Sequence, residues 1–487
     1  MSGHYILGID QSTAGTKALV FNGEGVIVSR RDKPHEQKVS DRGWVSHDPE
    51  EIYRNTLEVC ADAVRAAGID AAVIAGIGIS NQRETALVWE RKSGRPVYDA
   101  VVWQCARGEA LCKAIAGDDA GAEENIRRRT GLRLSPYFSA AKIAWILEHA
   151  GRKGDKSLCA GTMDSWLIYK LTGSFKTDYS NASRTQLFNS NSLQWDDELC
   201  RLFSIDRETL AEVCDSNSVF GETDLEGLLP KPAPVHAAMG DSHAALFGQG
   251  CLEKGMGKVT YGTGSSVMIN SGETPEFCRD ISTSLAWGIN GKVDYVLEGN
   301  INYSGAVIKW LIEDLGLIGS AREAASLAAG AHRDDTTYLV PAFSGLGAPH
   351  WKADAKASLT GMTRATGKAE IVKAAEESIA YQIADVVNTA REEAGIELLT
   401  LRADGGATRD EYLMQFQSDI LNLPLEVSEN EELSAIGAAW MAGMALGLYP
   451  PALPDTMKRR RYIPAMDAHE RERRLSGWRE AVAKALC

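Results

Sequence analysis

The sequence lacks the features that mark secreted, membrane-spanning or nucleic-acid-binding proteins. Its nine cysteines are an odd number with no C-x-x-C pair, which is typical of reduced core thiols in the cytoplasm rather than of a disulfide framework. No basic segment followed by an apolar one opens the chain, and no apolar run approaches the roughly 20 residues of a membrane span. Lys and Arg number 52 against 66 Asp and Glu, a net charge of −14. Because nucleic-acid binding needs clustered basic residues, we expect a cytoplasmic protein with neither nucleic acid nor membrane as partner.

Strand and helix patterns alternate along the 487 residues, which predicts an α/β protein of more than one domain. Two segments, 5–21 and 257–270, each read as a strand, a polar Gly/Thr/Ser turn and a second strand. We therefore predict a duplicated α/β module with a cleft between the copies, divided into residues 1–250 and 251–487. The alternative is an accidental likeness, because hairpins are common.

The hairpin tips carry groups suited to phosphate. In "DQSTAGTK", Asp10 ends the strand, several hydroxyls follow, and Lys17 supplies a cation. "YGTGSS" (261–266) is similar but lacks the cation. Backbone N–H groups and hydroxyls at such turns can cradle phosphate oxygens, and Asp10 could hold water on Mg²⁺. Taken singly, each tip is also explained as an ordinary turn.

A third Gly-rich turn, "RADGGATRDEYL", joins a strand to a helix at Gly405 and Gly406. A helix that starts after two glycines offers free N–H groups to a phosphate or a nucleotide. The alternative is a tight strand-to-helix connection. The later stretch 433–447, "LSAIGAAWMAGMALG", consists largely of small residues and predicts a closely packed helix rather than a chemical site.

Polar residues in apolar surroundings indicate a second part of the candidate site, separate from the turns suited to phosphate. "GIGISNQRETALVWE" ends a strand with Arg83 and Glu84, and a buried pair of this kind needs mutual hydrogen bonds or a polyhydroxyl ligand. "AAMGDSHAALFGQG" places Asp241 among small residues ahead of a helical run. Trp103 and Tyr137 could supply an apolar wall and a hydroxyl, although residue type alone favours the core for both.

Ten stretches make the chain resemble the FGGY carbohydrate kinases. They are "GIDQST", "WVSHDPEEIY", "GISNQRET", "VVWQCAR", "YFSAAKIAWIL", "TDYSNASRTQLFN", "GDSHAALFGQ", "YGTG", "LVPAFSGLGAPHW" and "DGGATRDEYLMQFQSDIL". Within the family, the chain is most similar to the glycerol kinase branch. The resemblance implies two actin-like ATPase domains of the ribonuclease H type with ATP in the cleft between them, and phosphorylation of a primary hydroxyl of a small polyol or sugar, glycerol to glycerol 3-phosphate.

The resemblance also implies roles for individual residues. Asp241 matches the catalytic base, which would take the proton of the attacking hydroxyl. Asp10 matches the metal-associated aspartate, with Mg²⁺ as the ion. The substrate positions are Arg83, Glu84, Trp103, Tyr137, Asp241, Ser242 and Ser266. The nucleotide positions are Thr13, Lys17, Thr263, Gly264, Gly305, Lys309, Gly406, Ala407 and Asp410.

Several positions depart from the glycerol kinase pattern. Ser242 and His243 stand in place of Gln-Gln, and Ser266 stands in place of Phe, so the pocket is expected to be larger and wetter. A tetritol, a pentitol or a pentulose such as xylulose is therefore the alternative substrate. His243 either touches it or, as the alternative, lies behind the site or faces solvent. Lys309 and Asp410 replace Gln and Asn, which makes the adenine contacts less certain than the phosphate contacts.

The resemblance also allows expectations about regulation and about assembly. The loop before Asp241 lacks the Gly-rich, Arg-containing segment through which bacterial glycerol kinases bind fructose bisphosphate, so that inhibition is expected to be absent. A homo-oligomer, dimer or tetramer, is expected from the resemblance. Two other classes share a related fold: a chaperone or filament ATPase would lack the Arg83, Glu84 and Asp241 set, and a sugar-responsive repressor would need a DNA-binding helix-turn-helix before the first strand.

Overall fold

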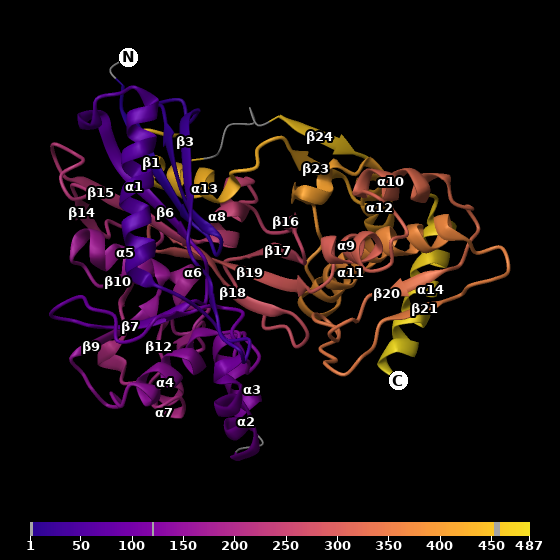
Figure 1. The fold of residues 1–487 in the computed structure, drawn as a ribbon, viewed down its shortest axis with the longest axis horizontal. Coiled ribbons are helices and arrows are strands. Elements are labelled where there is room, and N and C mark those ends of the chain that lie inside the picture. The colour runs from indigo at the N-terminus through magenta and orange to yellow at the C-terminus, as the bar shows by residue number, and fades with distance from the viewer. Residues whose placement is uncertain (1–2, 119–120, 452–457) are drawn as a thin grey trace.

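The computed structural model describes residues 3–118, 121–451 and 458–487 and contains two large β-sheets flanked by helices (Figure 1). The first sheet has the order β14-β15-β6-β1-β2-β3. Its strands are β1 (Tyr5–Gln11), β2 (Gly15–Phe21), β3 (Ile27–Pro34), β6 (Ile74–Asn81), β14 (Gly221–Thr223) and β15 (Ala233–Gly240). Strands β1, β2 and β3 form an antiparallel meander, whereas β1, β6 and β15 run parallel.

The second sheet repeats this arrangement. Its order is β18-β19-β17-β16-β22-β23-β24. Its strands are β16 (Met256–Tyr261), β17 (Ser265–Gly272), β18 (Ser282–Ile289), β19 (Lys292–Ile301), β22 (Thr400–Gly405), β23 (Leu425–Ser428) and β24 (Arg459–Tyr462). Strands β16, β17 and β19 are antiparallel and β16, β22 and β23 are parallel, as in the first sheet. The predicted duplication of an α/β module is therefore confirmed.

Smaller sheets lie beside these two. A five-stranded sheet consists of β4 (Lys38–Val39), β5 (Val45–His47), β8 (Ala100–Val101), β7 (Ala86–Glu90) and β9 (Leu158–Thr162). Three pairs complete the set: β10 (Lys176–Asp178) with β13 (Glu212–Cys214), β11 (Phe188–Asn189) with β12 (Gln194–Trp195), and β20 (Tyr338–Val340) with β21 (Ser358–Thr360).

Helices cover the sheets. In the first half they are α1 (Pro49–Ala67), α2 (Glu109–Asp118), α3 (Ala122–Thr130), α4 (Ser139–His149), α5 (Met163–Thr172), α6 (Tyr179–Ala182), α7 (Asp197–Leu202) and α8 (Asp241–Gly248). In the second half they are α9 (Gly305–Glu313), α10 (Ala321–Gly330), α11 (Lys368–Ala394), α12 (Glu411–Leu421), α13 (Leu433–Ala445) and α14 (Ala468–Leu486). Local signals set their ends: Asp48 caps the start of α1 and Gly68 ends it in the left-handed conformation.

Helix α13 belongs to the second half of the chain but packs on the first sheet. It contacts β1, β6 and β15, and it lies against α8 (Figure 1). Its small residues permit this: a Cβ on Gly78 of β6 would lie 2.2 Å from the carbonyl oxygen of Ala438, and one on Gly437 would lie 1.9 Å from that of Ala244. The predicted close packing of segment 433–447 is confirmed. The division at residue 250 stays a prediction.

The described residues bear out the expectation about the cysteines. All nine cysteines are free and seven of them are buried, in agreement with their prediction as core residues. Within the described ranges, no helix combines the length and apolar character that crossing a membrane requires.

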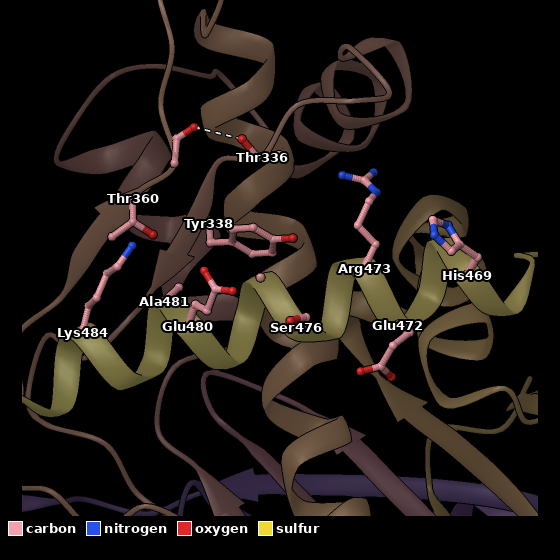
Figure 2. Close-up of a pocket in the computed structure, with 12 residues that line it drawn as sticks. Thr336, Tyr338, Thr360, His469, Glu472, Arg473, Ser476, Glu480, Ala481 and Lys484 are labelled. Atoms are coloured by element: carbon pink, nitrogen blue, oxygen red, sulfur yellow. Dashed lines mark hydrogen bonds between the residues drawn. The ribbon is translucent and has the colours of Figure 1, made fainter.

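A cavity of about 720 Å³ lies between α14 and the β20–β21 pair (Figure 2). It is formed entirely by the second half, and its walls mix Arg473 and Lys484 with Glu472 and Glu480. Arg473 already pairs with Glu470. This cavity includes none of the residues to which the sequence assigns chemistry.

Candidate active site

A second cavity, of about 780 Å³, lies between the two halves and gathers most of the predicted site residues. Of the predicted positions, its lining includes Asp10, Thr13, Lys17, Arg83, Glu84, Trp103, Tyr137, Asp241, Ser242, Thr263, Gly264 and Ser266. Among its other lining residues are Lys258, Thr260, Asn300, Asp404 and Glu432. We refer to this cavity as the cleft.

The parallel strands explain why residues far apart in sequence meet here. Gln11, Asn81 and Gly240, the last residues of β1, β6 and β15, are in register across the first sheet. The next residues of each chain segment therefore emerge at one edge of the sheet, which is where open α/β sheets bind ligands. In the second sheet, Tyr261 and Gly405 are paired in the same way; the loop after Tyr261 lines the cleft, and β22 reaches it through Asp404.

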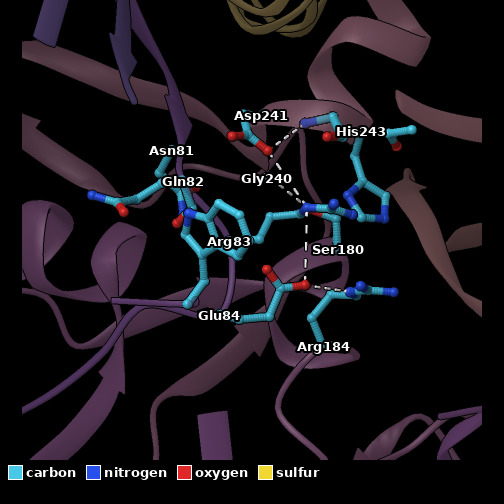
Figure 3. Close-up of polar contacts among 12 residues, drawn as sticks. Asn81, Gln82, Arg83, Glu84, Ser180, Arg184, Gly240, Asp241 and His243 are labelled. Atoms are coloured by element: carbon cyan, nitrogen blue, oxygen red, sulfur yellow. Dashed lines mark hydrogen bonds and ion pairs between the residues drawn. The ribbon is translucent and has the colours of Figure 1, made fainter. Parts of the chain in front are cut away.

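Asp241 is the first residue of α8 and its side chain is 33% exposed to the cleft. Its Oδ1 accepts the N–H of Ser242 at 2.6 Å and lies 3.4 Å from Nε of Arg83 (Figure 3). The start of a helix favours a negative charge because free N–H groups point toward it. Gly240 is required here, since a Cβ on it would lie 2.6 Å from the Arg83 side chain.

Arg83 and Glu84 are both buried and within ion-pair distance of each other, but their side-chain hydrogen bonds go to other partners. Arg83 donates two hydrogen bonds to Glu298, at 3.0 and 2.7 Å, whereas Arg184 donates to Glu84 at 2.6 Å. Nε of Arg83 lies 4.0 Å from Glu84, and Arg184 lies 2.8 Å from Glu298. Glu298 and Arg184 are far from this pair in the sequence, so no local pattern predicts them as its hydrogen-bond partners. We call these four residues the ion network; Figure 3 labels Arg83, Glu84 and Arg184.

Within the ion network, the two arginines keep the carboxylate of Glu298 negatively charged. Burial alone would raise the pKa of Glu298, but Arg184 and Arg83 override it and hold that pKa well below its usual range. Glu84 adopts φ of 58°, a left-handed backbone that is uncommon outside glycine and clusters at functional sites. The network therefore holds Arg83 and Glu84 rigidly beside Asp241.

Trp103 and Tyr137 form an aromatic wall of the cleft rather than part of the core. Their rings meet edge to face with centroids 5.6 Å apart, and Nε1 of Trp103 donates to Oγ1 of Thr13 at 2.9 Å. Burial raises the pKa of Tyr137, so its hydroxyl stays protonated. An apolar wall with polar edges suits the carbon skeleton of a polyhydroxyl ligand.

The tips of both hairpins face the cleft. In the first, Lys17 pairs with Glu432 at 2.8 Å and Thr13 lies at the turn. In the second, the N–H of Gly262 donates to the carbonyl of Gly264, and a Cβ on Gly264 would lie 2.3 Å from the carbonyl oxygen of Ile301. Only a residue without a side chain fits at that position, so the turn lies flat against β19.

Asp10 lies beneath the first tip. It accepts a hydrogen bond from Ser80 at 2.9 Å and faces Lys17 across the hairpin. Burial raises the pKa of Asp10 to about 6, although Lys17 and Ser80 act in the opposite direction. Because Lys17 and Ser80 offset only part of the effect of burial on Asp10, its carboxylate is suited to bind a cation.

The remaining predicted nucleotide positions do not line the cleft, which leaves their roles as predictions. They are Gly305, Lys309, Gly406, Ala407 and Asp410. Gly305 donates its N–H to Gly262 and so supports the second tip. Lys309 is exposed and pairs with Glu313 at 3.4 Å. Asp410 caps α12 through the N–H of Leu413.

The positions that depart from the glycerol kinase pattern have different surroundings. Ser242 and Ser266 both line the cleft, and the Ser266 hydroxyl donates to Glu298 at 3.3 Å. His243 is fully buried and is not a cleft residue; its Nε2 lies 3.4 Å from Ser284. Burial and the nearby Arg83 lower the pKa of His243 well below its usual value. Of the two alternatives for His243, the position behind the site is therefore the one found.

Sequence reasoning missed Arg184 and Glu298. A signal was present for Glu298, because it is a carboxylate inside the apolar strand segment "YVLEG". No comparable local signal marked Arg184, which follows a run of small polar residues and is buried against Glu84, Glu298 and Phe138.

Comparisons with known proteins agree with this geometry. Residues 5–248 match the N-terminal domain of the FGGY family of carbohydrate kinases, and residues 257–446 match its C-terminal domain. Glycerol kinase 1 of Thermotoga maritima is 48% identical over 99% of both chains, and the glycerol kinase of Bacillus licheniformis is 43% identical over 99% of both.

Solved structures give the same fold. The crystal structure of Plasmodium falciparum glycerol kinase with ADP has a TM-score of 0.93 and 34% identity, covering 100% of this chain and 99% of that one. A xylulose kinase from Lactobacillus acidophilus has a TM-score of 0.88 at 21% identity, covering 99% of each chain, and so bears on the fold alone. The predicted pair of actin-like, ribonuclease H-like domains is confirmed. The chain belongs to the FGGY family of carbohydrate kinases and is an ATP-dependent kinase.

Proposed function

We propose that this chain transfers the γ-phosphoryl group of ATP to a primary hydroxyl of glycerol, giving glycerol 3-phosphate. The observation that carries the proposal is the cleft, whose lining includes Asp241, Arg83 and Glu84 of the ion network, and both hairpin tips. Glycerol is supported by relatives whose names describe glycerol kinases and which are 42% to 48% identical across the whole chain.

In this proposal Asp241 is the general base. Its carboxylate takes the proton of the attacking hydroxyl as that oxygen forms a bond to the γ-phosphorus and the bond to the leaving ADP oxygen breaks. Arg83 Nε, 3.4 Å away, orients the carboxylate. Arg83 and Glu84 would bind neighbouring hydroxyls as donor and acceptor, with Trp103 and Tyr137 covering the carbons. Most of the rate enhancement then comes from positioning and from charge compensation.

We propose Mg²⁺ as the ion used with ATP and Asp10 as the residue that would hold it, through water. The described residues contain no cluster of three or more His, Cys, Asp or Glu side chains that could form a cage. That fits Mg²⁺, which is usually bound by one or two carboxylates together with substrate phosphates. When bound, the ion supplies charge neutralisation on the phosphates. Thr13, Lys17, Thr263 and Gly264 would hold the phosphates, and the positions around Gly305, Lys309, Gly406, Ala407 and Asp410 the nucleoside.

A larger substrate, such as a tetritol, a pentitol or xylulose, is the second candidate. It is favoured by Ser242 and Ser266, which line the cleft where the glycerol kinase pattern has bulkier side chains. Burial of extra hydroxyls is favourable only if the site offers partners. The hydroxyl of Ser242, which lines the cleft, offers such a partner.

The test is an ADP-release assay with Mg-ATP and a panel of glycerol, erythritol, xylitol, D-xylulose and dihydroxyacetone. We expect glycerol to give the highest kcat/KM. We expect Asp241→Asn to lower kcat by about 10²–10⁴-fold, the range of general base catalysis, with little change in the KM for ATP. A four- or five-carbon substrate with the highest kcat/KM would replace glycerol by the second candidate, and ATP hydrolysis indifferent to every alcohol would refute both.

We further propose that the protein acts in the cytoplasm as a homo-oligomer, dimer or tetramer. The free cysteines are in keeping with a reducing compartment. Light scattering of the purified chain tests the oligomer, and a mass equal to one chain of 52.7 kDa would contradict it.

A further inference from the structure

The two hairpins are copies in the fold but differ in charge. The first presents Lys17 on its second strand, paired across the hairpin with Asp10. In the second hairpin the equivalent tip has hydroxyls and glycines but no cation in its sequence. The structure supplies one from outside the tip: Lys258, on the first strand of the hairpin, lines the cleft.

Strand geometry places Lys258 there. Lys258 and Thr260 are two residues apart on β16 and so point to the same face of the sheet. Thr260 is paired with Ser266 on β17 and with Asp404 on β22, and all three of these residues line the cleft. Lys258 therefore extends a polar row from the tip of the hairpin into the cleft.

The surroundings of Lys258 leave its charge without a direct partner. The side chain is buried, and Nζ donates to Oγ1 of Thr260 at 2.9 Å. Within residues 3–118, 121–451 and 458–487, no carboxylate lies within ion-pair distance of it, whereas Lys17 pairs with Glu432 and Arg83 with Glu298. An ammonium group has three N–H donors, and burying such a charge is costly unless it is paired.

The charges around Lys258 indicate which ligand would complete it. Burial lowers the pKa of Lys258, Asp404 opposes this, and Arg83, Glu298 and Asp241 also act on it. Of these, Arg83 and Asp241 line the cleft, and Asp241 is the proposed base. Lys258, Asp241 and the second hairpin tip line the same cleft, so an anion bound by Lys258 would lie in the cavity that holds the proposed base.

We infer that Lys258 is a further catalytic residue, whose ammonium donates hydrogen bonds to the phosphoryl group in transfer and so serves the second hairpin as Lys17 serves the first. The inference rests on the proposed assignment of the cleft as the ATP site. Lys258 transfers no proton in this step: it offsets negative charge on the non-bridging oxygens as the bond to ADP breaks.

The experiment compares Lys258→Met and Lys258→Arg with a matched control, Lys292→Met, an exposed lysine on β19 of the same sheet. Met has a similar length and no charge, so it fits the buried position. We expect Lys258→Met to lower kcat by about 10²–10³-fold, as the loss of one preorganised donor does, and to weaken binding of a non-hydrolysable ATP analogue at least tenfold while adenosine binding is unchanged. Lys258→Arg keeps part of the rate, and Lys292→Met keeps all of it.

Each outcome decides the question. Wild-type kcat in Lys258→Met overturns the inference, and so does an equal loss of adenosine and ATP-analogue binding, which would make Lys258 a structural counter-charge for Asp404. If Lys258→Met does not fold, Lys258→Arg provides the test. Arginine places its positive charge at a different position, so we expect kcat to fall at least tenfold while adenosine binding is retained. If Asp241→Asn is inactive while Lys258→Met is normal, only this inference fails; if both are fully active, the proposed site itself is wrong.

Discussion

Four buried charges connect the two halves of the molecule at the head of the cleft. In this ion network Glu298 accepts from Arg83 and lies beside Arg184, while Arg184 holds Glu84. Buried ion pairs of this kind contribute little net stability as intact units, but removing one member leaves an uncompensated charge. The network therefore serves to position Arg83 and Glu84, and removal of any one member lowers the stability of the folded protein.

We expect Glu298→Gln to destabilise the protein by about 3–5 kcal/mol at pH 7, because two guanidinium groups lose their shared carboxylate. The folded pKa of Glu298 is depressed, so its contribution is present above the unfolded pKa of about 4.3 and is lost as pH falls toward the folded pKa. Urea midpoints from pH 7 to pH 3 should therefore fall less steeply in the variant. Parallel pH profiles would contradict this, and Glu222→Gln, an exposed site on β14, serves as control.

Ser266 lines the cleft at a position where the glycerol kinase pattern has the bulkier Phe. We expect Ser266→Phe to lower kcat/KM for four- and five-carbon substrates about tenfold or more while glycerol is little affected, because added bulk excludes extra carbons at roughly 1–3 kcal/mol each. Kinetics on the substrate panel measure this ratio. Ser266→Ala removes only the hydroxyl that contacts Glu298 and should leave the ratio near that of the original chain. A uniform loss in Ser266→Phe would mean that the position does not select substrate size.

At the scale of elements, the contact between α8 and α13 places the proposed base. Asp241 starts α8, and Ser434 of α13 donates its hydroxyl to the carbonyl of Asp241 at 3.1 Å. The two helices approach through Gly248 and Gly437, where added methyl groups would lie 2.2 and 1.9 Å from backbone carbonyl oxygens. The small residues thus set the position of a catalytic group as well as the packing.

We expect Gly437→Ala to lower stability by about 1–3 kcal/mol, the usual effect of overpacking, and to lower kcat because α8 must shift. Thermal unfolding and the ADP-release assay measure the two effects. Gly117→Ala in α2, where no atom lies within 4 Å of the added carbon, is the matched control and should be neutral or slightly stabilising. Equal behaviour of the two variants would show that the close approach does not matter.

Elements set by local chemistry could be predicted from the sequence, and contacts between distant elements could not. The cap at Asp48, the stop at Gly68 and the two hairpin turns depend on neighbouring residues. The partner of Arg83 is 215 positions away, and no local pattern specifies such a pair. Likewise, the small residues at 433–447 predicted close packing but not that the partner would be the first sheet.

At the scale of the whole molecule, α13 makes the first sheet dependent on the second half of the chain. A protein of residues 1–250 would expose the faces of β1, β6 and β15 that α13 covers. We expect this fragment to aggregate and to bind a hydrophobic dye, and the same fragment with residues 431–448 attached through a flexible linker to be markedly more soluble. Size-exclusion chromatography and dye fluorescence measure the difference. A monomeric 1–250 fragment that binds no dye would contradict the expectation.

The return of α13 also has a consequence for synthesis on the ribosome. The last strand that α13 covers, β15, ends at residue 240, and α13 begins at residue 433. At about 5–20 residues per second, roughly 10–40 s pass before the covering helix leaves the ribosome. During that interval an apolar face of three strands is open to the cell, so the nascent chain needs protection that the finished protein does not.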